Sequence, residues 1–327
     1  MRRVLVTGAG GFVGAYVARR LAGDGHAVTA TVRPGGDPWR LRAAPGVNVL
    51  GLDLADGPAI GVAVAAVRPE WILHLAAHGA YSWQTDRERI LDVNLRATIA
   101  LLDAAVAYGV EAFVHAGSSS EYGVKGHAPA ETEAPEPNSD YAVMKAAATL
   151  HCAHVARSAG IHAVTLRLYS VFGPWEEPGR LVPTLLARGL DGTLPPLVAP
   201  DTARDFVFVD DVCDAFVAAA ERTDLPRGTI LNVGSGRQVT LREIVAVTCE
   251  LLEVAAEPEW GSHDARRWDT SVWVADPSLA ARLTGWHARR SLHDGLAASV
   301  RWLLAHPELW QRYDVNPPAA QAALRRW

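Results

Sequence analysis

Residues 3–14 read RVLVTGAGGFVG, a short apolar run that leads into a turn rich in glycine. The apolar run predicts a buried strand over residues 3–7. Apolar residues then recur at helical spacing through residues 13–21, which predicts a helix directly after the turn. A strand, a glycine turn and a helix in this order form the opening unit of dinucleotide-binding folds.

The spaced glycines have separate physical roles in such a turn. Gly8 allows the tight turn, Gly11 lets the backbone approach a pyrophosphate, and Gly14 lets the helix pack closely on the strand. The phosphates would lie at the helix N-terminus, beside the backbone of Phe12 and Val13. We predict a dinucleotide site here; the alternative is an ordinary turn between a strand and a helix.

Further apolar segments alternate with helical ones along the chain. Residues 71–76 form a nearly continuous apolar run, which is typical of a parallel strand buried on both faces, and a helical pattern covers residues 90–108. With 327 residues the chain exceeds the usual size of one core, so we expect a large α/β domain and a smaller lobe. The expected strands cover residues 3–7, 27–32, 47–50, 71–76, 112–116, 162–168 and 229–233.

The composition is that of a soluble globular protein. A net charge of −5 gives no general attraction for nucleic acid or for an anionic membrane. No apolar stretch is long enough to span a bilayer and the start of the chain lacks a signal-peptide pattern, so we expect a cytoplasmic protein. Cys152, Cys213 and Cys249 are odd in number and widely spaced, which indicates free thiols and neither a disulfide framework nor a metal site.

The end of the second strand bears on the choice of dinucleotide. NAD-binding folds often carry an acidic residue there to hold the ribose hydroxyls, whereas residues 30–33 read ATVR. The guanidinium of Arg33 suits a 2′-phosphate, which favours NADP(H) over NAD(H) unless Arg33 is an ordinary surface residue. Beyond the third strand, Asp53 either accepts a hydrogen bond from the adenine amino group or forms a turn.

The run SDYAVMK, residues 139–145, carries a candidate catalytic pair. If the run is helical, Tyr141 and Lys145 lie one turn apart on the same face. A neighbouring ammonium lowers the pKa of a phenol, and a phenol tuned in this way acts as a general acid or base. Lys125 and Lys145 are the only lysines in the chain, which argues against a chance pairing; the alternative is a solvated surface helix.

Two other segments lie near the expected carboxyl edge of the sheet. His74 interrupts an apolar strand, and we expect it to be a hydrogen-bonded core histidine rather than a catalyst. The fifth strand runs into GSSSEYG, residues 117–123, and ligands of open parallel sheets bind beyond the carboxyl ends of strands. The serines therefore either face a ligand or form a loop. Residues 126–138 hold three prolines and are predicted to be a loop.

Together these segments resemble the extended short-chain dehydrogenase/reductase superfamily, in particular its nucleotide-sugar epimerase/dehydratase/reductase branch. No single segment is specific, whereas their ordered set is, and it spans nearly the whole chain. The matching segments are TGAGGFVG at 7–14, HLAA at 74–77, Asn94, SSSEYG at 118–123, YAVMK at 141–145, LRLYSVFGP at 166–174, RDFVFVDDV at 204–212 and LNVGSG at 231–236.

The resemblance implies a Rossmann-type doubly wound parallel sheet with a smaller α/β carboxy-terminal lobe that closes over a nucleotide-diphosphate sugar. The dinucleotide-binding domain would comprise residues 1–172, with residues 205–236 returning to it. The substrate-binding lobe would comprise residues 173–204 and 237–327. By analogy with the family, the resemblance also implies a homodimer.

The resemblance assigns roles by position. Tyr141 would be the acid/base, Lys145 would bind the nicotinamide ribose and lower the pKa of Tyr141, and Ser118 would contact the reacting oxygen. The expected cofactor residues are Gly8, Gly11, Phe12, Val13, Gly14, Arg33, Asp53, Leu54, Leu75, Ala76, Ala77, Asn94, Tyr141, Lys145, Tyr169, Ser170 and Val171. The expected substrate residues are His78, Ser119, Ser120, Tyr141, Ser170, Arg180, Leu181, Val182, Arg204 and Arg266.

The chain departs from the family pattern at three places that bear on its reaction, its substrate contacts and its cofactor. Members that eliminate water carry an Asp-Glu pair directly after the Ser/Thr position, where this chain has Ser119 and Ser120, so 4,6-dehydration is not expected. The family's usual Asn is Ser170 here, which leaves the substrate contact at that position open. The family's 4-epimerases usually hold NAD through an acidic residue after the second strand, and Arg33 in that neighbourhood instead resembles the NADPH-using reductases.

Arginines far apart in the sequence are candidates for the substrate's pyrophosphate, because planar guanidinium groups bind phosphate oxygens in pairs. Arg204 and Arg266 match family positions that approach the phosphates, and Arg180 matches less well. Exposed ion pairing is the alternative for each of them.

These observations favour an NADPH-dependent ketoreductase of a nucleotide-linked 4-keto-6-deoxysugar, with Tyr141 as the proton donor. The first alternative is a nucleotide-sugar 4-epimerase with tightly bound NAD. The second is a non-catalytic NADP-binding regulator, although such proteins typically lose the Tyr/Lys pair that this chain retains. The nucleobase, the sugar and the stereochemistry of reduction are not specified by the sequence.

Overall fold

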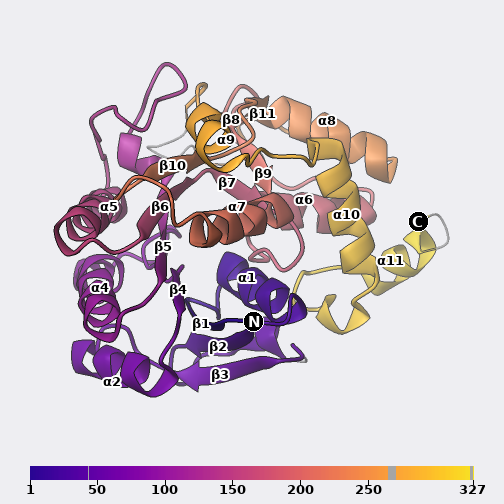
Figure 1. Cartoon of the computed structure of the whole chain (residues 1–327). Coiled ribbons are helices and arrows are strands. Elements are labelled where there is room, and N and C mark those ends of the chain that lie inside the picture. The colour runs from indigo at the N-terminus through magenta and orange to yellow at the C-terminus, as the bar shows by residue number, and fades with distance from the viewer. Residues whose placement is uncertain (43, 264–269, 325–326) are drawn as a thin grey trace.

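The computed structural model describes residues 1–42, 44–263, 270–324 and 327. A parallel sheet of seven strands forms the middle layer, in the order β10-β6-β5-β4-β1-β2-β3 (Figure 1). This topology confirms the predicted Rossmann-type α/β fold. The strands of the sheet are β1 (Arg3–Thr7), β2 (Ala27–Val32), β3 (Val47–Gly51), β4 (Trp71–His74), β5 (Ala112–Ser118), β6 (Ala163–Leu168) and β10 (Ile230–Val233).

Helices cover both faces of this sheet, as expected for parallel strands joined by crossovers. Helices α1 (Phe12–Gly23) and α7 (Val209–Glu221) pack together on one face. The other face is covered by α2 (Gly57–Val67), α4 (Ala97–Tyr108) and α5 (Asp140–Ala159). Shorter helical segments between these elements are η1 (Trp39–Leu41), α3 (Arg87–Leu91), the π-helical turn η2 (Asp92–Arg96) and η3 (Ser119–Tyr122).

Strand β1 shows why the sheet needs both helical layers. Its side chains from Val4 onward are fully buried and alternate between the two faces. Val4 and Val6 belong to the apolar cluster that includes α1 and α7, whereas Leu5 belongs to the cluster under α2 and α4. Burial of one such side chain contributes about 1.5–3 kcal/mol, so a layer of helices on each face stabilises the sheet.

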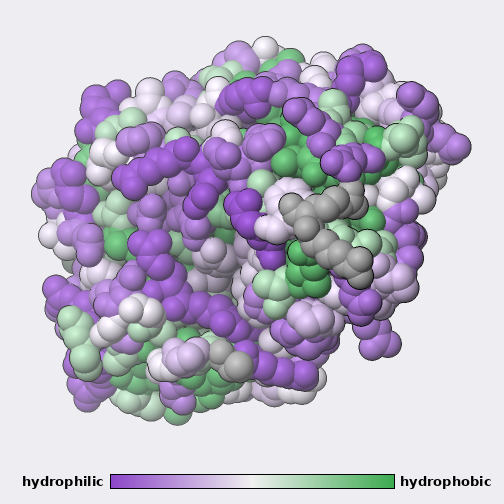
Figure 2. All heavy atoms as spheres, turned by 90° about the vertical axis from the view of Figure 1, so that its right-hand side faces the viewer, coloured by the Kyte–Doolittle hydropathy of each residue, from purple (hydrophilic) through white to green (hydrophobic). Residues whose placement is uncertain are grey.

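The carboxy-terminal part of the chain builds most of a second apolar cluster, which also includes Trp39, and its helices lie on the right-hand side of the molecule in Figure 1. Hydrophilic residues cover much of the face that Figure 2 presents, and hydrophobic residues appear there in separate patches. Two small sheets pair β7 with β9 and β8 with β11. The elements are β7 (Ser170–Phe172), α6 (Leu181–Leu190), β8 (Ala203–Arg204), β9 (Phe206–Phe208), β11 (Val239–Thr240), α8 (Leu241–Leu252), α9 (Ser278–Thr284), α10 (Leu292–Leu304), η4 (Pro307–Leu309) and α11 (Pro317–Ala323).

Two predicted strands differ by two residues at their ends, for identifiable reasons, whereas β3, β6 and β10 differ by one residue each. Strand β4 ends at His74 rather than at residue 76, because its neighbour β1 already turns away at Gly8. Strand β5 continues to Ser118 rather than ending at residue 116, because Gly117 and Ser118 pair with β6. Strand β10 returns to the sheet as predicted, and the structure shows that it pairs with β6. The division of the chain into two domains at residue 172 stays a prediction.

Two predictions about cysteines and membranes can be compared with the structure. Cys152, Cys213 and Cys249 are free thiols, the first two buried and the third half-buried. Among the described residues, no helix is both long enough and apolar enough to cross a bilayer.

Candidate active site

The glycine turn adopts a geometry that only glycine accommodates. Gly8 has a φ of +72°, and a Cβ placed on it would lie 2.5 Å from the backbone nitrogen of Ala76. A Cβ on Gly14 would lie 2.4 Å from the carbonyl oxygen of Gly8. Helix α1 begins with Gly11 as its N-cap and has no side-chain cap, so its first N–H groups can bind an anion. The turn therefore fits the pyrophosphate of a dinucleotide.

Charged residues surround the end of β2, where the adenosine ribose is expected. Arg33 is exposed and follows the last residue of the strand. Asp53 accepts hydrogen bonds from the guanidinium of Arg89 at 2.8 and 3.2 Å and from the backbone N–H of Ala55 at 3.0 Å. Asp53 thus forms the turn that was one of its two expected roles. Hydrogen bonding from Arg89 is the main reason that the pKa of Asp53 lies below its ordinary value, and the charge of Arg33 contributes.

A substitution tests the predicted contact of Arg33 with a 2′-phosphate. Arg33→Ala is expected to weaken NADPH binding by about tenfold, because charge-assisted hydrogen bonds contribute roughly 1.5–3 kcal/mol before solvent screening. NADH binding should change little. Both affinities can be measured by quenching of protein fluorescence, with Arg42→Ala as the matched exposed control. Equal affinities of the wild type for NADPH and NADH would contradict the NADP preference.

The loop after β4 is held by Asn94, which lies in the π-helical turn η2. Its amide nitrogen donates to the carbonyl oxygen of His78 at 2.6 Å, and its carbonyl oxygen accepts from the N–H of His78 at 3.0 Å. The buried side chain of Asn94 therefore positions this loop, and a direct contact of Asn94 with the cofactor stays a prediction. His74 is a hydrogen-bonded core histidine, as expected, since Thr7 and Thr98 contact its two ring nitrogens.

The expected catalytic residues come together at the carboxyl end of β5. Ser118 is the last residue of this strand, and Tyr141 lies in the first turn of α5, which is capped by Ser139. Ser118 lies near enough to the phenol of Tyr141 to lower its pKa. Lys145 is buried one turn further along α5 and donates to the carbonyl oxygen of Ala116 at 2.9 Å. The predicted Ser-Tyr-Lys arrangement is therefore present in the fold.

The pKa of Tyr141 beside Lys145 differs from the expectation. Burial raises the pKa of Tyr141 to about 12, although Ser118 and the charge of Arg180 lower it. Burial also lowers the pKa of Lys145 to about 8. The expectation that Lys145 brings the pKa of Tyr141 below that of a free phenol was wrong for this structure. The effect of burial on the pKa of Tyr141 outweighs the effects that lower it, and Lys145 directs its ammonium to the carbonyl oxygen of Ala116.

A buried ion pair that the sequence analysis missed supports Ser118. Glu121 is fully buried, and its carboxylate binds the guanidinium of Arg167 at 2.8 Å. It also accepts from the backbone N–H of Ser118 at 2.8 Å and from the hydroxyl of Thr149 at 3.0 Å. An arginine inside the apolar strand β6 was the available signal, because a buried guanidinium requires a partner.

Polar and aromatic residues line a small pocket next to Ser118. Ser119 and Tyr169 contribute to its wall, together with Lys125 and Trp273. Ser170 follows in β7, and its backbone N–H donates to the carbonyl oxygen of Asp205. Of the two consecutive serines, Ser119 is buried and Ser120 is half-buried.

The arginines of the carboxy-terminal lobe have different surroundings. Arg180 is exposed at the N-terminus of α6, 3.7 Å from the carboxylate of Glu176 and 5.8 Å from the ring centre of Tyr81. It precedes Leu181, which is half-buried, and Val182, which is buried. Arg204 lies 5.6 Å from the ring of Trp273, and Trp273 lines the small pocket. Arg266 lies outside the described residues.

Tyr81 is a further neighbour of the site that sequence reasoning missed. Its loop is ordered by a hydrogen bond between Gly79 and Gln84, and a Cβ on Gly79 would lie 3.4 Å from the Cβ of Tyr141. The only signal in the sequence was its position after the fourth strand. The described residues contain no cluster of His, Cys, Asp and Glu suited to a metal ion.

Comparison with known proteins places these features in a family. The model of the NAD dependent epimerase/dehydratase family matches residues 4–234. The chain is 31% identical over 323 residues to a dTDP-glucose 4,6-dehydratase of Streptomyces griseus, with 94% of this chain and 96% of that protein covered. It is 30% identical over 332 residues to a dTDP-6-deoxy-L-talose 4-dehydrogenase (NAD(P)(+)) of Kitasatospora kifunensis, with 97% of each covered.

The fold agrees with solved structures of this kind. A UDP-glucose 4-epimerase of Thermus thermophilus in complex with NAD superposes with a TM-score of 0.81 and 30% identity, covering 92% of this chain and 98% of that one. The chain therefore belongs to the NAD dependent epimerase/dehydratase family, a family of enzymes within the extended short-chain dehydrogenase/reductase superfamily.

Proposed function

We propose that this protein is an NADPH-dependent ketoreductase that acts at carbon 4 of a nucleotide-linked 4-keto-6-deoxysugar. The observation that carries the proposal is the phenol of Tyr141, which lies near enough to Ser118 at the carboxyl edge of the sheet for Ser118 to lower its pKa, with Lys145 buried one turn away. Similarity to a 4-dehydrogenase of a dTDP-deoxysugar over 97% of the chain supports a reaction at carbon 4.

The chain's own residues would handle the proton and the carbonyl oxygen. A bound nicotinamide supplies the hydride. A pKa of about 12 keeps the phenol of Tyr141 protonated at neutral pH, as a proton donor must be. Ser118 would donate a hydrogen bond to the reacting oxygen and stabilise the negative charge that develops on it. Lys145 would hold a ribose hydroxyl with the N–H groups that Ala116 leaves available.

Two groups of arginines support the choice of ligands. The exposed Arg33 after β2 supports NADPH, since a 2′-phosphate needs a cationic partner. Arg180 and Arg204 support a substrate with a pyrophosphate. Arg180 lies close enough to Tyr141 to affect its pKa, and Arg204 lies 5.6 Å from the ring of Trp273, which lines the small pocket together with Ser119.

The immediate surroundings of Ser118 argue against elimination of water from the sugar. That reaction needs a base and an acid near the sugar in addition to Tyr141. The next two residues, Ser119 and Ser120, carry hydroxyl groups rather than carboxylates. The nearest carboxylate along the chain, Glu121, is fully buried and bound to Arg167. Glu121 is therefore not free to exchange a proton with a substrate.

A nucleotide-sugar 4-epimerase is the second candidate. Its support is the similarity to a UDP-glucose 4-epimerase bound to NAD, at 30% identity and a TM-score of 0.81. An epimerase oxidises and reduces carbon 4 with the same cofactor, so NAD should copurify with the protein and no NADPH should be consumed. Net oxidation of NADPH distinguishes the reductase from the epimerase.

A substrate screen tests the proposed function directly. Oxidation of NADPH would be followed by its near-ultraviolet absorbance with dTDP-, UDP-, GDP- and CDP-linked 4-keto-6-deoxyhexoses. We expect turnover with at least one of them, and none with the Tyr141→Phe variant under the same conditions. Absence of NADPH oxidation with all four, together with copurified NAD, would exclude the reductase in favour of the epimerase.

The pKa values predict a pH dependence for reduction. Lys145 has a pKa lowered to about 8 by burial, so it is charged below that pH and loses its charge above it. Because the charged form donates hydrogen bonds to the ribose, kcat/KM for reduction is expected to fall as pH rises through about 8. Initial rates measured from mildly acidic to strongly alkaline pH give this profile. A profile that stays flat well above the pKa of Lys145 would contradict the role of this residue.

We also propose that two copies of the chain associate through α4 and α5. These helices pack against each other, and α5 exposes Val143 and Leu150 on its outer side. Pairing of this face with a second copy would remove the exposed apolar side chains from water.

A further inference from the structure

Arg40 is a buried cation that lies between the glycine turn and the carboxy-terminal lobe. Its side chain is only 3% exposed, and its guanidinium lies 4.1 Å from the ring centre of Trp39. Three different acceptors bind it. Its Nη1 donates to the carbonyl oxygen of Gly10 at 3.1 Å, its Nε to the carbonyl oxygen of Trp175 at 2.7 Å, and its Nη2 to the carboxylate of Glu177 at 2.7 Å.

The first of these acceptors belongs to the dinucleotide site. Gly10 lies within the turn that connects β1 to α1, next to Gly11, the N-cap of α1. A hydrogen bond to the carbonyl oxygen of Gly10 restrains the peptide that also carries the N–H of Gly11. That N–H is held in turn by the carbonyl oxygen of Gly8 at 3.0 Å. Arg40 therefore helps to fix the backbone on which the pyrophosphate of a dinucleotide would lie.

The other two acceptors belong to residues 173–180, the segment that leads into α6. Trp175 has a φ of +71°, which is unfavourable for a residue with a side chain, and so its backbone conformation must be held by its surroundings. The carbonyl oxygen of Glu177 accepts from the N–H of Arg180 at 2.9 Å. A continuous set of contacts thus runs from Gly10 through Arg40 and Glu177 to Arg180.

We propose that Arg40 is a positioning residue that couples binding of the dinucleotide to binding of the nucleotide substrate. The coupling rests on the proposed function, because it takes Arg180 as a ligand of the substrate pyrophosphate. If the guanidinium of Arg40 loses one of its acceptors, the cost of burying its charge remains without the hydrogen bond that offsets it. The glycine turn and the segment before α6 should therefore adopt their ligand-bound conformations together. By linkage, each ligand then raises the affinity for the other by the same factor.

Calorimetric titration of UDP, dTDP, GDP and CDP, with and without saturating NADPH, measures this coupling without turnover. The nucleotide that binds the wild type most tightly serves as the probe. NADPH is expected to tighten its binding by about five- to fiftyfold, the usual range for coupled sites. In Arg40→Met the ratio of the two affinities should fall to nearly one. Arg42→Met is the matched control, since Arg42 is exposed and pairs with Asp37, and it should retain the wild-type ratio.

Glu177→Gln is a second variant, which tests the coupling even if Arg40→Met fails to fold. It removes the charge of the acceptor in the segment before α6 but leaves the hydrogen bonds of Arg40 to Gly10 and Trp175. NADPH affinity should stay within about twofold, whereas the ratio should fall at least about threefold. A wild-type ratio near one, or an unchanged ratio in Glu177→Gln, would overturn the coupling and leave the proposed function intact. If none of the four nucleotides binds the wild type, the proposed function fails, and the coupling fails with it.

Discussion

Tyr141→Phe is expected to lower kcat for reduction by about 10²–10⁴-fold, the range by which a positioned general acid accelerates a reaction. The substitution removes one hydroxyl and leaves the ring in place, so α5 and the buried Lys145 should keep their positions. Ser118 should also stay in place, because Ser120 and Glu121 bind it independently of the phenol. Binding of NADPH, measured by fluorescence, is expected to change by less than about threefold, since the phenol acts on the reacting oxygen rather than on the dinucleotide.

Tyr16→Phe is the matched control for this prediction. Tyr16 lies on α1, and its hydroxyl donates to Asp210 at 2.7 Å, so the variant also loses one hydrogen bond of a tyrosine. It should keep the wild-type kcat, because its hydroxyl binds a structural carboxylate. If Tyr141→Phe retained full turnover, the proton would have to come from another group and the proposed mechanism would be wrong.

The sheet could be predicted from the sequence because its strands are apolar on both faces and lie between strong turn signals. Strands β1 and β2 have the predicted bounds of residues 3–7 and 27–32. The errors at β4 and β5 depend on neighbours. A strand ends where its partner ends, and a single sequence does not reveal which strands are adjacent. Gly117 and Ser118 resemble turn residues, yet pairing with β6 keeps them in the sheet.

The Ser-Tyr-Lys arrangement could also be predicted, since two of its members are four residues apart on one helix and the third follows a strand. The direction of the shift in the pKa of Tyr141 could not. That shift depends on burial, which raises the pKa, and on where the ammonium of Lys145 points. Both are tertiary properties. The same reason explains why Arg89 and Arg40 were missed, since each binds partners distant in the sequence.

The buried ion pair of Glu121 and Arg167 leads to the prediction with the largest effect on stability. Glu121→Gln leaves the guanidinium of Arg167, which is 1% exposed, without a charged partner. Breaking a buried pair by removing one charge costs about 3–5 kcal/mol, so the free energy of unfolding should fall by that amount. Turnover should fall as well, because the N–H of Ser118 loses the carboxylate that orients it. Denaturation by urea, followed by circular dichroism, measures the first effect.

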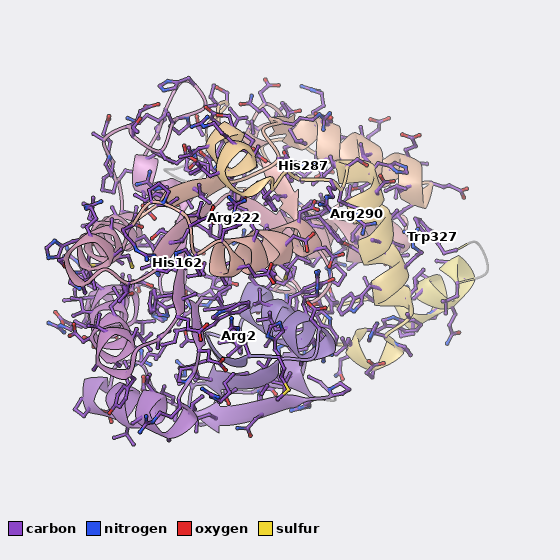
Figure 3. All side chains as sticks on the ribbon, in the orientation of Figure 1. Arg2, His162, Arg222, His287, Arg290 and Trp327 are labelled. Atoms are coloured by element: carbon purple, nitrogen blue, oxygen red, sulfur yellow. The ribbon has the colours of Figure 1, made fainter. Side chains whose placement is uncertain are left out.

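A double variant distinguishes the effect of removing both buried charges from the effect of leaving one buried charge unpaired. Replacing both partners, as in Glu121→Leu with Arg167→Met, removes two buried charges together and should destabilise the protein less than Glu121→Gln does. Asp224→Asn is the surface control, since its partner Arg222, labelled beside α7 in Figure 3, is an exposed residue at the end of that helix and exposed pairs contribute little. The interpretation would be wrong if Glu121→Gln unfolded at the same urea concentration as the wild type. In that case Glu121 would be protonated in the native state, and Ser118 would be held by a neutral acid rather than by a carboxylate.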